Sequence, residues 1–234
     1  MSRILCPNCT REYDDALSIC PGCGHDRNAP FQSFAPSIII AGPDSERGGH
    51  VVKVADPGVE SEARRTDDGS VSLDVAGAAG IGRPGEARVA LTLKERLVRN
   101  GHRVEILGGD DSGGVDRILI VDGETLVLQV TIAPQAGSFW RDASQSSANT
   151  HVSQPHAASW LREAVDSKAA APSLQDAPVL LAVDARHAGV VALPDLVHEY
   201  LTRYRSPDRE FGFASVWVVG PTADYCTRLG SGHP

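Results

Sequence analysis

The chain has 234 residues, 41% of them hydrophobic, and a formal net charge of −8. This length and apolar content predict one medium-sized globular domain with a small appendage and exclude a wholly disordered chain. The negative charge counts against a protein that coats nucleic acid through bulk basic charge. No apolar run approaches the roughly 18–20 residues of a membrane span, and the first residues lack a basic-then-apolar export signal. We therefore expect a cytoplasmic protein with no membrane contact.

Two Cys-x-x-Cys pairs, separated by ten residues, stand near the N-terminus. Each pair can direct two thiolates at one ion, and four thiolates complete the tetrahedral shell of a structural Zn²⁺. Residues 1–28 are therefore predicted to form a zinc ribbon that folds on binding its metal. Two disulfides are the less favoured alternative in a chain without an export signal. The predicted ligands are Cys6, Cys9, Cys20 and Cys23. Docking of nucleic acid, docking of a protein partner and capping of the main domain remain open as roles.

Residues 29–70 are rich in Pro, Gly and charge, and are predicted to be a linker that is partly disordered near Glu60–Asp68. Two short apolar pieces, 37–40 and 50–54, are candidate strands within it. The main domain is then predicted over residues 71–234.

The sequence GIGRPG at residues 80–85 matches the Gly-x-Gly-x-x-Gly pattern of dinucleotide loops. Three features favour a Gly-rich linker instead. Pro84 restricts the loop, the next strand ends in Gly108-Gly109 where a ribose-binding acid is expected, and the chain then makes a hairpin rather than a second βα unit.

Hydrophobic periodicity predicts an alternating series of helices and strands in the main domain. Asp122-Gly123 suits the tight turn of a hairpin between two of the strands. Basic residues gather in and around the first helix and could offer a local basic face despite the net charge. The helices are predicted at 85–100, 156–170 and 193–205, and the strands at 103–107, 115–121, 125–132, 178–185 and 214–220.

The resulting order of helix, three strands, helix and strand resembles the PD-(D/E)XK nuclease superfamily. Residues 93–131 resemble the central block of Mrr-type restriction endonucleases. Gly114-Val115-Asp116 fits a Gly-Val-Asp element, and Gln129-Val130-Thr131 stands at the position of Gln-x-Lys. The resemblance covers roughly residues 85–185. It implies an α/β fold with an αβββαβ restriction-endonuclease-like core and a mixed sheet, beside the small four-cysteine zinc ribbon.

The resemblance also implies Mg²⁺-dependent hydrolysis of phosphodiester bonds, with DNA as the partner. Asp116 is the best metal ligand, and Gln129 offers a weaker, neutral oxygen. Thr131 replaces the family lysine; it can position a water but carries no positive charge. Lys168 on the following helix is the candidate for a migrated lysine. Glu86, early in the first helix, is a tentative further ligand, although a solvated charge at a helix N-terminus is an equal interpretation.

Three functions follow from these patterns. The favoured one is a metal-dependent DNA endonuclease, with defence against foreign DNA as a suggested role. The alternative is a catalytically inactive nuclease-like module that binds or scaffolds, with the zinc ribbon as its docking element. A nucleotide-dependent protein acting through residues 80–85 is the third.

Overall fold

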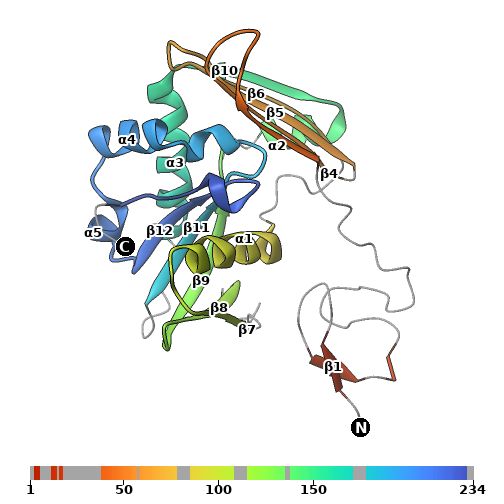
Figure 1. The fold of residues 1–234 in the computed structure, drawn as a ribbon, viewed down its shortest axis with the longest axis vertical. Helices are drawn as coiled ribbons and strands as arrows, with labels where there is room; N and C mark the ends of the chain where they lie inside the picture. The colour runs from red at the N-terminus through yellow and green to blue at the C-terminus, as the bar shows by residue number, and fades with distance from the viewer. Residues whose placement is uncertain are drawn as a thin grey trace.

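The computed structural model describes residues 3–5, 12–14, 16–17, 38–56, 58–77, 85–107, 115–134, 138–170 and 178–230. The predicted zinc ligands and most of the GIGRPG segment lie outside the described residues. The described chain is a mixed α/β protein with two large sheets and several helices (Figure 1). A separate two-stranded sheet pairs β1 (Arg3–Leu5) with β2 (Glu12–Asp14). No helix in the described parts is both long and apolar enough to cross a membrane.

The six-stranded sheet has the strand order β13-β12-β11-β9-β8-β7. Strands β7, β8 and β9 form an antiparallel meander, β9, β11 and β12 run parallel, and β13 returns antiparallel. The Asp122 and Gly123 residues both have positive φ at the tight β8–β9 turn, as the sequence predicts. The strands are β7 (Val104–Leu107), β8 (Arg117–Val121), β9 (Glu124–Ile132), β11 (Val179–Asp184), β12 (Ser215–Val219) and β13 (Cys226–Arg228).

The two faces of this sheet are covered by different helices, because side chains alternate along each strand. Leu128, Val130 and their neighbours on β11 and β12 pack against α1 (Glu86–Arg99). Leu181 and Val183 on the opposite face pack against α3 (Gln154–Ala169) and α4 (Pro194–Arg203). Both faces of β11 are buried, which explains its continuous apolar sequence.

The five-stranded antiparallel sheet has the order β10-β6-β5-β4-β3 and lies at the top of Figure 1. Most of it comes from the stretch that the sequence predicted to be a linker. The candidate strands at 37–40 and 50–54 are confirmed by β3 and β4, whereas the linker prediction is wrong for the rest of 38–56 and 58–70, which includes β5. Strands β4 and β5 alternate buried residues such as Val52 and Ala63 with charged outward ones such as Lys53 and Glu62. A sheet with one solvent-exposed face therefore has a composition similar to that of a polar linker. The strands are β3 (Ile38–Pro43), β4 (His50–Asp56), β5 (Val59–Arg65), β6 (Val71–Gly77) and β10 (Ala148–Val152).

The inner face of the five-stranded sheet joins the core of the main domain. Val52 and Leu73 share one hydrophobic cluster with Trp140 of α2 (Phe139–Gln145), with α3 and with Val190 of the short helix η1 (Gly189–Ala192). The predicted boundary at residue 70 therefore divides a sheet that packs as one body with the helices. The elements that periodicity did not predict include β5 and several short ones: α2, β10, α5 (Pro207–Phe211), η1, η2 (Ala223–Tyr225) and β13.

Candidate functional site

Asp116 directly precedes β8, at the place where β8 begins to pair with β9. Its backbone N–H donates to the Leu128 carbonyl at 3.2 Å, and its Oδ2 accepts a hydrogen bond from the Val130 N–H at 2.5 Å. The carboxylate thus occupies the position that a strand carbonyl would have in a regular ladder. A hydrogen bond to an ionised acceptor is among the stronger ones in proteins. It holds the half-buried carboxylate of Asp116 in a fixed place at the end of β8.

Gln129 and Thr131 flank Val130 and point to the α3 side of the sheet. Both are buried, with 7% and 3% of their surface exposed. The Thr131 Oγ1 lies 3.3 Å from the Oγ of Ser167, near the C-terminal end of α3. The structure therefore brings the Gln129–Thr131 segment of β9 beside Asp116, at the end of β8 where the two strands begin to pair.

Lys168 follows Ser167 in the last turn of α3 and is half-buried. Because Ser167 contacts Thr131, the backbone of Lys168 lies next to the sheet face that carries Gln129 and Thr131. Lys168 therefore belongs to the helix that packs on the face of the sheet carrying Gln129 and Thr131.

Glu86 belongs to the other side of the sheet. Its Oε2 lies 3.7 Å from Nη1 of Arg117, whose side chain is only 11% exposed. The same Nη1 donates to the backbone carbonyl of Asp116 at 2.5 Å. Arg117 is in register with Leu128, which packs towards α1. Glu86 is therefore near the backbone of Asp116, but its carboxylate faces a cation on the α1 side.

The donor set for a divalent ion is small. Among the described residues, no three His, Cys, Asp or Glu side chains form a group that could hold a metal. The available oxygens are one carboxylate from Asp116, the amide of Gln129 and a strand carbonyl. Mg²⁺ commonly takes one or two carboxylates and completes its shell with waters and substrate phosphates. These residues fit an ion that is bound together with a phosphate group, and they do not fit a preformed protein cage.

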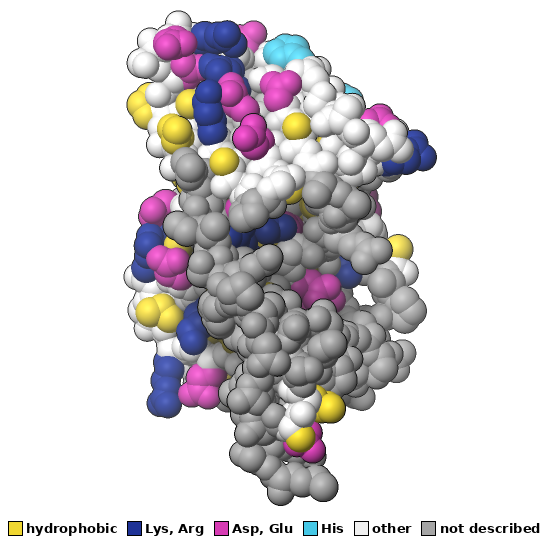
Figure 2. Space-filling model, turned by 90° about the vertical axis from the view of Figure 1, so that its right-hand side faces the viewer, with side chains coloured by type: hydrophobic (Ala, Val, Ile, Leu, Met, Phe, Trp, Pro, Cys, Tyr) yellow, Lys and Arg dark blue, Asp and Glu magenta, His cyan; other side chains and the backbone are white. Residues whose placement is uncertain are grey.

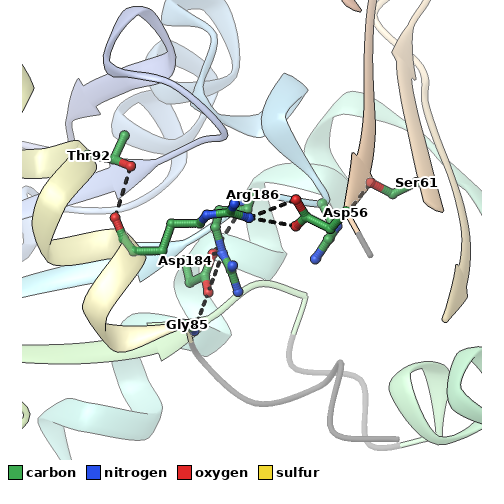
Figure 3. A network of polar contacts seen from close by, with 8 residues as sticks. Asp56, Ser61, Gly85, Thr92, Asp184 and Arg186 are labelled. Atoms are coloured by element: carbon green, nitrogen blue, oxygen red, sulfur yellow. Dashed lines mark hydrogen bonds and ion pairs between the residues drawn. The ribbon is translucent and has the colours of Figure 1, made fainter. Parts of the chain in front are cut away.

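A second carboxylate, Asp184, ends β11 opposite Ile132 of β9 and is 1% exposed. Its Oδ2 accepts the N–H of Gly85 at 2.8 Å, and its Oδ1 accepts the N–H and the Nε of Arg186 at 3.1 and 3.0 Å (Figure 3). Burial acts to lower the pKa of the Arg186 guanidinium, but the Asp184 carboxylate outweighs burial and the pKa is raised. Asp184 belongs to no sequence motif, and its ion pair with a residue two positions further on carries no pattern that periodicity can detect.

Gly85 begins α1 and is the last glycine of the GIGRPG motif. A Cβ added there would collide with the guanidinium of Arg186. Its N–H is already taken by the Asp184 carboxylate. Both facts account for a glycine at this position through contacts within the protein. They concern Gly85 alone, because residues 80–84 lie outside the described part of the chain.

Two further contacts tie this network to the five-stranded sheet. Arg88 of α1 donates from Nη1 to both oxygens of Asp56 at 2.8 and 2.7 Å. Ser61 Oγ lies 3.0 Å from Nδ1 of His187, and both side chains are buried. Burial, with a smaller effect from Arg186, lowers the pKa of His187 to about 4. The imidazole is therefore neutral at physiological pH.

Three of the described arginines in and around α1 are paired with acidic side chains. Arg88 pairs with Asp56, Arg99 with Glu95 and Asp224, and Arg103 with Glu105. On the face seen in Figure 2, the described Lys and Arg side chains are interleaved with Asp and Glu. The paired residues of α1 thus give little support to electrostatic binding of DNA along this helix.

Comparisons of the chain with protein families, with curated proteins and with solved structures gave no match.

Proposed function

We propose that the chain is a metal-dependent nuclease of the PD-(D/E)XK type that acts on DNA through Asp116. The main support is the hydrogen bond from the Val130 N–H to the Asp116 carboxylate. Val130 stands between Gln129 and Thr131 in β9, so this bond brings the carboxylate to that segment. The order α1-β7-β8-β9-α3-β11, with α2 and β10 inserted between β9 and α3, supports the same assignment: β7, β8 and β9 are antiparallel and β11 is parallel to β9. This order is the one that an αβββαβ core of that superfamily would have.

Each residue of the proposed site would have a separate role. Asp116 and the amide oxygen of Gln129 would hold Mg²⁺, which when bound polarises a phosphate and lowers the pKa of a bound water. Asp116 keeps its orientation through the Val130 N–H. Thr131, beside Ser167, offers a hydroxyl that orients a water by hydrogen bonding. Lys168, one residue further along α3, is the candidate for the positive charge that Thr131 lacks.

The second candidate is a nuclease-like module that binds without cleaving. Thr131 at the lysine position favours it, as does the absence of a three-acid group among the described residues. The paired arginines of α1 favour it as well. Here the zinc ribbon would recruit a protein or nucleic acid.

For that ribbon we propose one structural Zn²⁺ on Cys6, Cys9, Cys20 and Cys23. Metal analysis of purified protein should give one zinc per chain, and Cys20→Ser should release it.

Incubation of supercoiled plasmid with the full chain distinguishes the two candidates. We expect nicking in Mg²⁺ or Mn²⁺ and none in EDTA. Asp116→Asn should abolish it while keeping an acceptor for the Val130 N–H. Asp142→Asn, at an exposed position on α2, is the matched control and should cleave like the wild type. A wild-type protein that binds DNA without cutting it establishes the second candidate. Cleavage that survives Asp116→Asn removes Asp116 from the site.

A further inference from the structure

Strand β3 forms an open edge of the five-stranded sheet. Its sequence, Ile-Ile-Ile-Ala-Gly-Pro, carries no charge. The other edges of the two large sheets are shorter and more polar: β7 carries Glu105, β13 has three residues including Arg228, and β10 carries Asn149 and His151. Proteins usually blunt an edge strand with charge, short length or proline, because unpaired backbone groups attract another strand. Within the described sheets, β3 is the longest edge strand and carries no charge, and its proline stands only at the last position.

The hydrogen-bond phase of the β3–β4 hairpin shows which backbone groups face outward. Asp44 N–H donates to the Gly49 carbonyl, so this pair is a hydrogen-bonded one. Antiparallel pairs alternate between bonded and non-bonded. The N–H and C=O groups of Ile39 and Ala41 therefore point away from β4. Pro43 has the same phase and no N–H, so it ends the row of outward donors.

The side chain next to these groups is apolar and accessible. Ile40 is 58% exposed, and it begins a cross-strand row that continues through Lys53 and Glu62. This row lines a hollow of about 470 Å³ on the outer face of the sheet. The Lys53 Nζ lies 2.8 Å from a Glu62 oxygen, so the cation beside Ile40 is already paired. A second apolar strand can approach this edge without meeting an uncompensated charge.

We propose that β3 pairs antiparallel with β3 of a second copy of the chain, about a two-fold axis at Ile40. In this register Ile39 faces the second copy's Ala41, and the two residues exchange both backbone hydrogen bonds. The axis repeats this exchange, so every outward group of Ile39 and Ala41 is satisfied. The two Ile40 side chains meet in the closely spaced, non-bonded pair. A two-fold interface needs a self-complementary surface, and an uncharged strand with outward groups at alternate positions provides one.

Light scattering on the full chain, coupled to size exclusion, tests the proposal directly. The wild type should have twice the chain mass of 24.8 kDa at micromolar concentration. Ile40→Lys and Ile40→Glu each place like charges opposite one another and should give monomers. A mixture of the two variants should recover the dimer, because the opposed charges then attract. Leu91→Lys is the control and should remain dimeric, since Leu91 is 60% exposed but belongs to helix α1 and not to the five-stranded sheet.

Amide hydrogen exchange provides a second readout at the same site. The Ile39 and Ala41 amides should be protected in the wild type and should exchange at least ten-fold faster in Ile40→Lys. A wild type that stays monomeric at about 100 µM overturns the proposal, whether the edge is then empty or bound by another protein. A dimer that survives Ile40→Lys, or that Leu91→Lys dissociates, places the interface elsewhere and also overturns it.

Discussion

Two carboxylates lie near the C-terminal ends of the neighbouring parallel strands β9 and β11, and their surroundings differ. Asp184 is 1% exposed and receives three N–H groups, from Gly85 and from the backbone and side chain of Arg186. Asp116 is half-buried and receives the N–H of Val130. A buried carboxylate with its own cation holds elements together, whereas a partly accessible one held from one side is suited to a ligand. This contrast distinguishes a structural acid from a candidate catalytic acid at the same end of the sheet.

The largest expected effect is that of Asp184→Ala on stability. It leaves the buried Arg186 charge without its carboxylate, and breaking a buried pair from one side typically costs about 3–5 kcal/mol of unfolding free energy. Urea unfolding followed by circular dichroism measures the loss. Asp224→Ala removes the exposed partner of Arg99 and should change stability by less than about 1 kcal/mol. Equal losses for the two variants would refute a structural role for Asp184.

Gly85→Ala tests the same network from the helix side. The added methyl group displaces the Arg186 guanidinium from its place beside Asp184, and overpacking of this kind costs about 1–3 kcal/mol. Gly42→Ala is the control, because a Cβ at Gly42 meets no atom within 4 Å. The same urea titration applies to both. A neutral Gly85→Ala would mean that Arg186 has room to move, and that the glycine is not required by this contact.

The neutral, buried His187 makes the network sensitive to acid. Its pKa is about 4 in the folded protein and 6.5 when unperturbed, so the unfolded chain binds the proton more readily. Stability is therefore fully present above pH 6.5 and falls as the pH decreases from 6.5 towards 4. Between pH 7.5 and 5 the loss from this group is about 2 kcal/mol.

Denaturant titrations at both pH values check this loss. His187→Gln should remove most of the pH dependence in this window, whereas His198→Gln, at an exposed position on α4, should leave it unchanged. An unaltered slope in His187→Gln would assign the acid sensitivity to other groups.

Long periodic stretches predicted the fold of the main domain well. The α1 helix, the β7–β9 meander and the buried β11 strand were all expected, because each has a clear period of 3.6 or 2, or a continuous apolar run. Strands β3 and β4 were predicted only as short candidate strands at 37–40 and 50–54, and β5 was missed. The outward-facing Lys53 and Glu62 give this half-exposed sheet the composition of a linker. The hairpin placed Asp116 beside Gln129, but no local pattern revealed that Asp184 binds Gly85 from 99 residues away.

Asp116→Asn should have the smallest effect on stability, within about 1 kcal/mol, because the amide oxygen can still accept the Val130 N–H. The effect should fall on metal binding. Calorimetry should detect weak Mg²⁺ binding to the protein alone and tighter binding in the presence of a DNA duplex, since phosphate oxygens complete the shell. Tight Mg²⁺ binding without DNA would indicate a preformed site. It would contradict a site made of one carboxylate, one amide oxygen and a strand carbonyl.

The central claim is that Asp116 serves chemistry while Asp184 serves structure. The most direct measurement is the rate of plasmid nicking in Mg²⁺ by wild type and Asp116→Asn, on samples shown to be equally folded. We expect the wild type to cut and the variant to be at least a hundred-fold slower with unchanged stability. Equal rates in the two proteins, or no cutting by the wild type under any divalent ion, would contradict it.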